Sequence, residues 1–340
     1  MSNNTNTLFW VITGAVIVLG IFLLVLNTNS NTITNIASKI SSLFSEKITE
    51  SEKEELNNPT NLKKYYSYLG NWDNIKMEDT SLFDFDEETG TILAYYGTSS
   101  NVVIPYQING INVKKIGPIG MKLNNRNFNY ENCLSFLELE KNNPNVPTVI
   151  SEREYYEEQG ILKDNACLSY VELKSVILPN TIEELGDDSF YYTESLTSIK
   201  LPESIKKIGN RAFFCSGLRS LDLSNLKQLT YIGEYAFNNS SITGDVIMPD
   251  SLTYLGQYSF GGNNIINAVI PKNLDVVQAR TFFANPNLAT LTFRGSQTNV
   301  SSLYMFHNNA KPTVYVPIGS KDWYKRFQCL SNFTIVEIEI

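Results

Sequence analysis

The stretch Ile199-Lys-Leu-Pro-Glu-Ser-Ile-Lys-Lys-Ile-Gly-Asn-Arg-Ala-Phe-Phe-Cys-Ser-Gly-Leu218 holds, in one run, every feature that recurs in the second half of the chain. It opens with apolar residues at alternate positions, which is typical of a strand with one buried face. Pro202 ends that strand, because proline cannot donate a hydrogen bond to a neighbouring strand. A unit of this size cannot cover its own apolar face, so we expect it to stack on copies of itself.

Two sequence markers each recur about every 23 residues, and they keep their positions relative to each other. The first is a glycine followed four residues later by phenylalanine, at Gly186/Phe190, Gly209/Phe213, Gly233/Phe237 and Gly256/Phe260, continued without its glycine at Gln278/Phe282. The second is an apolar residue before proline, at Leu178-Pro179, Leu201-Pro202, Met248-Pro249 and Ile270-Pro271, with Ser224 in the proline's place in one repeat. An internal period of this length indicates a solenoid.

Each part of the unit has an expected role. The alternating runs before the prolines predict strands at Val176–Leu178, Ile199–Leu201, Leu221–Leu223, Val246–Met248 and Ala268–Ile270. The glycine is expected to permit a tight turn or a positive φ angle. The phenylalanine, preceded by a small residue as in Ala212-Phe213, is expected to fill the core from the side opposite the strand.

The unit resembles the BspA-like class of leucine-rich repeats, which is typical of bacterial surface proteins and some parasitic protists. The resemblance covers about Phe83 to Ile340 and implies a mainly β leucine-rich-repeat solenoid with short turns and helices. It also marks Asp84–Ile92, Val102–Pro105 and Lys115–Gly117 as an entry segment and Val314–Pro317, followed by Tyr324, as a closing strand. Cys215 stands where that family often has a cysteine, which favours a buried thiol.

The interval between Gly117 and Gly186 departs from the pattern, because it spans three periods without either marker. Degenerate repeats are one interpretation, with relics at Asn132–Phe136 and Ala166–Tyr170. The other is an insertion loop at Asn142–Gln159, and degenerate repeats carrying such a loop combine the two.

The N-terminal run Leu8 to Leu26 contains no charged residue and is long enough to cross a bilayer as a helix. The segment before it lacks Lys and Arg, so an uncleaved transmembrane anchor is favoured over a signal peptide. An apolar stripe from Ile33 to Phe44 predicts a juxtamembrane helix, and a charged linker follows. The expected domains are therefore 1–30 (anchor), 31–62 (juxtamembrane helix and linker), 63–175 (entry cap and degenerate repeats with an insertion), 176–295 (regular repeats) and 296–340 (closing repeat).

Composition excludes several classes of function. The net charge of −8 and the lack of a basic block argue against a nucleic-acid partner. The four cysteines Cys133, Cys167, Cys215 and Cys329 form no C-x-x-C pair, and His307 is the single histidine, so we expect no metal site, no cofactor and no enzymatic activity. A bridge between Cys133 and Cys167 stays open for an oxidising compartment.

The candidate binding residues are those that point outward from the predicted strands: Ile177, Lys200, Asp222, Ile247, Val269, Thr292 and Tyr315. Such a row forms the extended binding surface of a solenoid, and several members are apolar for residues that face solvent. The alternative is that they reflect strand propensity alone. With the resemblance, this predicts a single-pass membrane protein whose extracellular solenoid binds a protein or another cell-surface macromolecule, as an adhesin does. A pilin-like or secretion-apparatus subunit, which self-associates through the N-terminal helix, is the alternative.

Overall fold

The computed structural model describes residues 54–71, 75–95, 97, 99–117, 173–301, 305 and 311–340. The chain divides into two units, residues 1–55 and 56–340, and nearly all described residues belong to the second. The predicted anchor Leu8 to Leu26, the Ile33–Phe44 stripe, Cys133, Cys167 and His307 all lie outside the described residues. Among those the structure does describe, no helix has the length and apolarity that crossing a bilayer requires.

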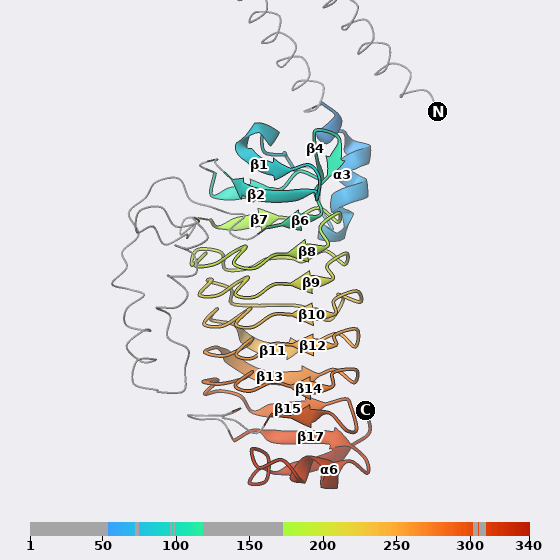
Figure 1. The fold of residues 1–340 in the computed structure, drawn as a ribbon, viewed down its shortest axis with the longest axis vertical. Helices are drawn as coiled ribbons and strands as arrows, with labels where there is room; N and C mark the ends of the chain where they lie inside the picture. The colour runs from blue at the N-terminus through green and yellow to red at the C-terminus, as the bar shows by residue number, and fades with distance from the viewer. Residues whose placement is uncertain are drawn as a thin grey trace, which may run out of the picture. The chain divides into compact units, whose positions relative to one another are not determined.

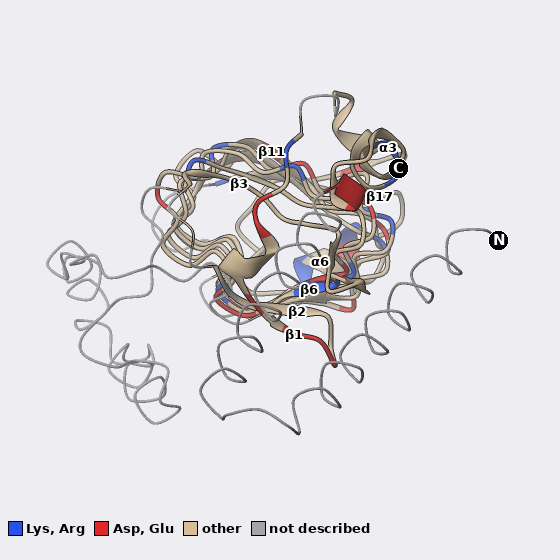
Figure 2. Cartoon of the chain, turned by 90° about the horizontal axis from the view of Figure 1, so that it is seen from above, with Lys and Arg blue, Asp and Glu red and all other residues tan. Residues whose placement is uncertain are grey.

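The second unit is a stack of coils joined by two ladders of mostly short parallel strands, and seen along the stack the coils superpose (Figures 1 and 2). The first ladder contains three of the five strands predicted before the prolines, at β7 (Ser175–Ile177), β11 (Thr243–Ile247) and β13 (Asn264–Ile270). In this ladder β3 (Asn101–Val103) pairs with β7, and β11 and β13 are followed by β15 (Thr290–Phe293), β17 (Thr313–Pro317) and β18 (Ile335–Ile338). The mainly β, leucine-rich-repeat solenoid expected from the repeats is thereby confirmed.

The second ladder was not predicted. It consists mostly of two-residue strands just before the repeat glycines: β6 (Lys115–Ile116), β8 (Glu184–Leu185), β9 (Lys207–Ile208), β10 (Tyr231–Ile232), β12 (Tyr254–Leu255), β14 (Val276–Val277) and β16 (Asn299–Val300). At its start, β1 (Phe83–Asp86) pairs antiparallel with β2 (Thr91–Tyr95), and β2 pairs parallel with β6. The predicted entry segment therefore forms the first hairpin of this ladder, and a second small hairpin joins β4 (Gln107–Ile108) to β5 (Ile111–Asn112).

Two predicted strands are absent from the first ladder, since Ile199–Leu201 and Leu221–Leu223 are not paired as strands. Side chains make hydrogen bonds at both segments. The hydroxyl of Tyr68 donates to the carbonyl oxygens of Leu178 and Lys200, at 2.7 and 3.3 Å. The Asp222 carboxylate accepts from the backbone N–H of Ser224 and bends the chain locally.

The interior is organised around a column of phenylalanines, as predicted. Phe190, Phe213, Phe237, Phe260 and Phe282 are each buried and stack face to face on the next, with ring centroids 5.0, 5.3, 5.2 and 5.9 Å apart. Facing them are the buried residues of the first ladder, such as those of β13 and β15. The core therefore runs continuously from coil to coil.

Of the two roles expected for the repeat glycines, a tight turn or a positive φ angle, the structure does not show the second. Gly186, Gly209, Gly233 and Gly256 have ordinary φ angles, and what they need is space. A Cβ atom on Gly233 would lie 2.6 Å from the backbone nitrogen of Asn210 in the preceding coil, and the other three would be equally crowded. Glycine is required here because two backbones approach each other closely where the coils stack.

The left-handed turns occur instead two residues after those glycines. Asp188, Arg211, Tyr235, Tyr258 and Arg280 have φ angles between 52° and 59°. None is glycine, so each repeat holds a conformation that a side chain ordinarily avoids. In the first four of these turns the backbone N–H of the left-handed residue donates to a carbonyl of the next coil, as Tyr235 does to Gln257 at 3.0 Å, and such bonds stabilise the strained turn.

Another unpredicted column is polar and buried: Thr193, Ser216, Ser240, Asn263 and Asn285. Asn263 is the most highly bonded member. Its Nδ2 donates to the carbonyls of Phe237, Phe260 and Gly261, and its Oδ1 accepts from the backbone N–H groups of Ser240 and Ile242. Thr193, Ser240, Asn263 and Asn285 thus satisfy backbone groups that the turn leaves without strand partners.

The start of the second unit packs against the first ladder. Helix α3 (Pro59–Tyr66) begins after Asn58, whose side chain caps it by accepting from the backbone N–H of Thr60. It continues into a short 3-10 turn, Ser67–Leu69. Tyr66 is fully buried in a small cluster with Leu62, Met77 and Tyr106. These aromatic contacts attach the helix to the outer side of the first coils.

The coil that ends at Gly117 pairs directly with the coil that contains Gly186. Val102 is opposite Val176 in the first ladder, and Ile116 is opposite Leu185 in the second. The degenerate repeats and the insertion loop expected between Gly117 and Gly186 fall on residues 118–172, which are outside the described part of the chain.

Candidate binding face

Four of the seven predicted binding residues lie side by side in register. Ile247 on β11 is opposite Val269 on β13, then Thr292 on β15 and Tyr315 on β17. The row extends one strand further than predicted, because Tyr315 pairs with Val336 on β18. We call these five residues the exposed row.

The side chains of the exposed row face away from the core. The residues on either side of Ile247, which are Val246 and Met248, are fully buried, so the strand alternates as predicted. Ile247 is 37% exposed and Val336 is 36% exposed, while the three between them are half-buried by their neighbours. Four of the five side chains are apolar or aromatic, and within the described residues no segment covers them.

The other end of the predicted row is covered. Ile177 packs against the α3 cluster, beside Val103. The ammonium of Lys200 donates to the backbone carbonyl of Tyr68 at 2.6 Å and lies 5.7 Å from the centre of the Tyr68 ring. Burial raises the pKa of the Tyr68 hydroxyl. Ile177 and Lys200 thus hold the N-terminal segment in place, and sequence periodicity gave no signal for this.

Asp222 lies between the covered and the exposed ends. It is exposed, and its carboxylate accepts hydrogen bonds from the hydroxyl and the backbone N–H of Ser224. These bonds, with a smaller attraction to Lys200, lower the pKa of Asp222. Its side chain is therefore committed to a local turn and is displaced from the exposed row.

A polar row runs parallel to the exposed row on the same strands. The Asn267 amide donates to Asp245 at 2.7 Å, and the hydroxyl of Thr290 donates to Asn267 at 2.6 Å. These side chains satisfy one another from coil to coil. The face of the first ladder is thus a hydrogen-bonded polar row beside a mainly apolar one.

The outward face of the second ladder has a different character. Glu184 lies between Lys115 and Lys207, at 2.9 and 3.1 Å from their ammonium groups. Partial burial raises the pKa of Glu184, but the hydrogen bonds from the two lysines outweigh that effect and lower it overall. Next to them Tyr231 and Tyr254 stack with ring centroids 4.6 Å apart. On this face the charged and aromatic side chains just named thus contact one another.

Neither described cysteine forms a disulfide. Cys215 is half-buried in one of the left-handed turns, with a φ angle of 52°. Cys329 is half-buried near the closing strand, and burial raises the pKa of its thiol to about 11. The described residues contain no group of three or more His, Cys, Asp or Glu side chains placed to hold a metal ion.

The comparisons with known proteins agree with this architecture. A model of the BspA type leucine rich repeat region matches six copies, at residues 161–289 and 224–326. Comparison with curated protein sequences gave no significant match.

Several solved structures are similar to this chain. A leucine rich repeat protein of T. pallidum is 16% identical, covers 78% of this chain and all of its own, and has a TM-score of 0.48. A leucine rich cell surface protein of Faecalibacterium prausnitzii is 20% identical over 63% of this chain and 53% of its own, with a TM-score of 0.40. The pneumococcal vaccine antigen PcpA is 20% identical over 48% of this chain and 41% of its own, with a TM-score of 0.38.

The family match falls on the same residues as the paired coils, the phenylalanine column and the crowded glycines. This chain therefore carries a repeat domain of the BspA leucine-rich-repeat type.

Proposed function

We propose that this chain is a membrane-anchored, cell-surface interaction protein that binds a macromolecular partner through the exposed row, as an adhesin does. The observation that carries the proposal is the register of Ile247, Val269, Thr292, Tyr315 and Val336, which places five outward side chains on five consecutive strands. A repeat domain of this family supports a protein partner in preference to a small molecule.

Burial of apolar surface is the driving force for such an interaction. Each apolar side chain that a partner removes from water contributes about 25 cal/mol per Å² of buried area. Ile247 and Val336 are exposed by more than a third in the free chain, so both have area to lose. A charge introduced into the row would have to be desolvated on binding, which would cost more than the contact contributes.

Anchoring and exposure at the cell surface rest on the sequence of Leu8 to Leu26. They are tested with a tag placed after Ile340. We expect an antibody against the tag to label intact cells. Labelling that requires permeabilisation would contradict a surface location and would remove adhesion from consideration.

The binding face is tested by Ile247→Asp, with Val276→Asp as the matched control. Val276 is a half-buried residue on the second ladder. Its replacement therefore also puts a carboxylate in place of an aliphatic side chain, but on a different face. We expect cells that display Ile247→Asp to lose attachment to a partner-bearing surface, and cells that display Val276→Asp to keep it. Both variants should retain the circular dichroism of the parent. Attachment that survives Ile247→Asp would contradict the proposed face.

A further inference from the structure

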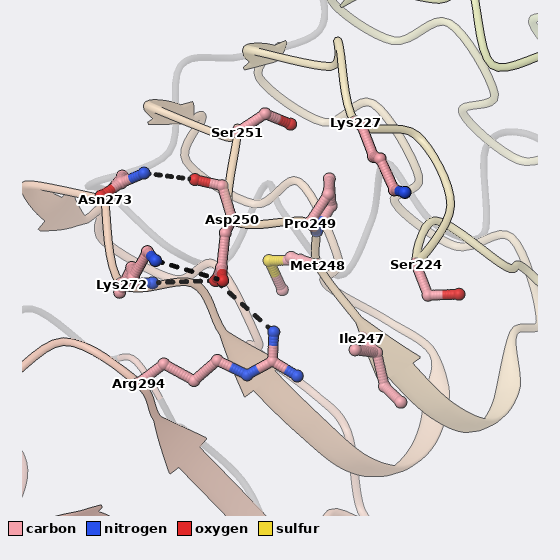
Figure 3. A pocket seen from close by; sticks show the side chains of 10 residues that line it. All are labelled: Ser224, Lys227, Ile247, Met248, Pro249, Asp250, Ser251, Lys272, Asn273 and Arg294. Carbon is pink, nitrogen blue, oxygen red and sulfur yellow. Dashed lines mark hydrogen bonds and ion pairs between the residues drawn. The ribbon is translucent and has the colours of Figure 1, made fainter. Parts of the chain in front are cut away.

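A pocket of about 470 Å³ opens at the end of the exposed row, next to Ile247. Its walls come from the turns that follow the first-ladder segments of four successive coils (Figure 3). The lining residues that matter here are the cations Lys227, Lys272 and Arg294, the carboxylate Asp250 and the apolar Ile247. We call this the basic pocket.

The basic pocket has more positive than negative charge, in a chain whose net charge is −8. Asp250 is its single acidic residue, and it contacts two of the three cations. Its carboxylate lies 3.4 Å from the Arg294 guanidinium and 3.8 Å from the Lys272 ammonium. Arginine has five N–H donors and lysine three, so one contact with Asp250 leaves both cations with donors for a second carboxylate.

Lys227 reaches the basic pocket from the coil before β11. It is exposed, and among the residues that the structure describes it forms no ion pair. In Figure 3 the Arg294 guanidinium extends toward Asp250 with Ile247 beside it, and Lys227 lies across the pocket from Asn273. An anionic group that enters between these cations would therefore come to rest beside the first apolar side chain of the exposed row.

We propose, on the basis of the proposed function, that the partner is a protein segment with an acidic residue next to apolar ones. Its aspartate or glutamate carboxylate occupies the basic pocket, while the adjacent apolar side chains lie on Ile247 and Val269. A single carboxylate matches the charge of the basic pocket, because Asp250 would repel a continuous polyanion. The rest of the exposed row carries no cation that such a polyanion could follow.

The experiment is the selection of a random dodecapeptide library on the full chain, held in mild detergent because of the apolar run Leu8 to Leu26. We expect the recovered peptides to be enriched in Asp or Glu adjacent to an apolar residue. A recovered peptide should bind the variant Lys227→Gln/Lys272→Gln about tenfold more weakly than it binds the parent, as for the loss of a partly desolvated ion pair. Replacement of its acidic residue by the amide should weaken its binding to the parent by a similar factor.

The control variant Lys174→Gln/Lys325→Gln removes two exposed lysines that do not line the basic pocket, and we expect it to bind like the parent. Peptides without an acidic residue whose binding is lost in Ile247→Asp would overturn the acidic partner and leave the exposed row as the binding face. Acidic peptides that bind Val269→Asp normally but lose affinity in the lysine variant would support the basic pocket and contradict the proposed face, because Val269 belongs to the exposed row and does not line the pocket.

Two other outcomes would overturn the inference. One is a selection that enriches no peptide. The other is self-association of the parent in sedimentation that Ile247→Asp abolishes, because the occupant would then be a second copy of this chain.

Discussion

Phe213 is the second of the five stacked phenylalanines, and its truncation to alanine is the most direct test of the fold. The ring is fully buried between Phe190 and Phe237, at 5.0 and 5.3 Å and nearly parallel to both. Its removal exposes two ring faces to an empty space that neighbouring coils cannot close, since their own rings are held by the same stack. Buried phenylalanine truncations cost about 3–5 kcal/mol, and the loss of two ring contacts places this one in the upper part of that range.

The measurement is urea unfolding of the parent and Phe213→Ala, followed by circular dichroism. Tyr315→Ala is the matched control, because it also removes an aromatic ring, but from a half-buried position in the exposed row. A cross-strand pair contributes about 1 kcal/mol or less, so the control should lose no more than that. Equal losses in the two variants, or a loss below about 1 kcal/mol in Phe213→Ala, would refute the assigned column.

Two further predictions test the stacking contacts. Gly233→Ala should destabilise the repeat domain by about 1–3 kcal/mol, because its Cβ would meet the Asn210 backbone at 2.6 Å, and an unchanged melting temperature would contradict that crowding. Because the pKa of Glu184 in the folded chain is below the ordinary value of 4.5, its stabilising effect is present above that value and disappears as the pH falls through the folded pKa. The melting temperatures of the parent and Glu184→Gln should therefore differ at neutral pH and converge in acid, and a difference that is constant with pH would exclude the two lysine bonds as its cause.

The sequence predicted the repeating features, because a solenoid imposes the same environment on the same position of every coil. The phenylalanine at position 213 and its equivalents were recognisable for that reason, and so were the alternating residues around Ile247. The second ladder was missed because its strands have only two residues, such as Lys207–Ile208, which is too short for alternation to be seen.

The role of the glycines could not be predicted correctly from the sequence. A glycine signals either a positive φ angle or a close approach, and the sequence does not distinguish the two. The residues with positive φ angles, such as Arg211 and Tyr235, are not glycines, so nothing in the sequence marks their conformation. Only the pairing of neighbouring coils reveals that the space next to Gly233 is filled by backbone.

The candidate face was predicted in part. Alternation located the outward residues, but it could not show that Ile177 and Lys200 lie beneath a segment more than a hundred residues earlier in the chain. Contacts of that kind depend on tertiary packing and leave no periodic signal. Val336 was missed because β18 lies beyond the last proline marker.

The size of the exposed row bears on what its partner must be. Five parallel strands about 4.8 Å apart give a row of about 19 Å, which is shorter than the footprint of a stable protein interface. Such interfaces bury about 800 Å² on each side, and five side chains that are partly buried already cannot supply that area. A partner cannot extend toward Ile177, because the Tyr68 segment covers that end. The proposed partner would gain further contact area on the basic pocket next to Ile247, where Lys227, Lys272 and Arg294 have donors to spare.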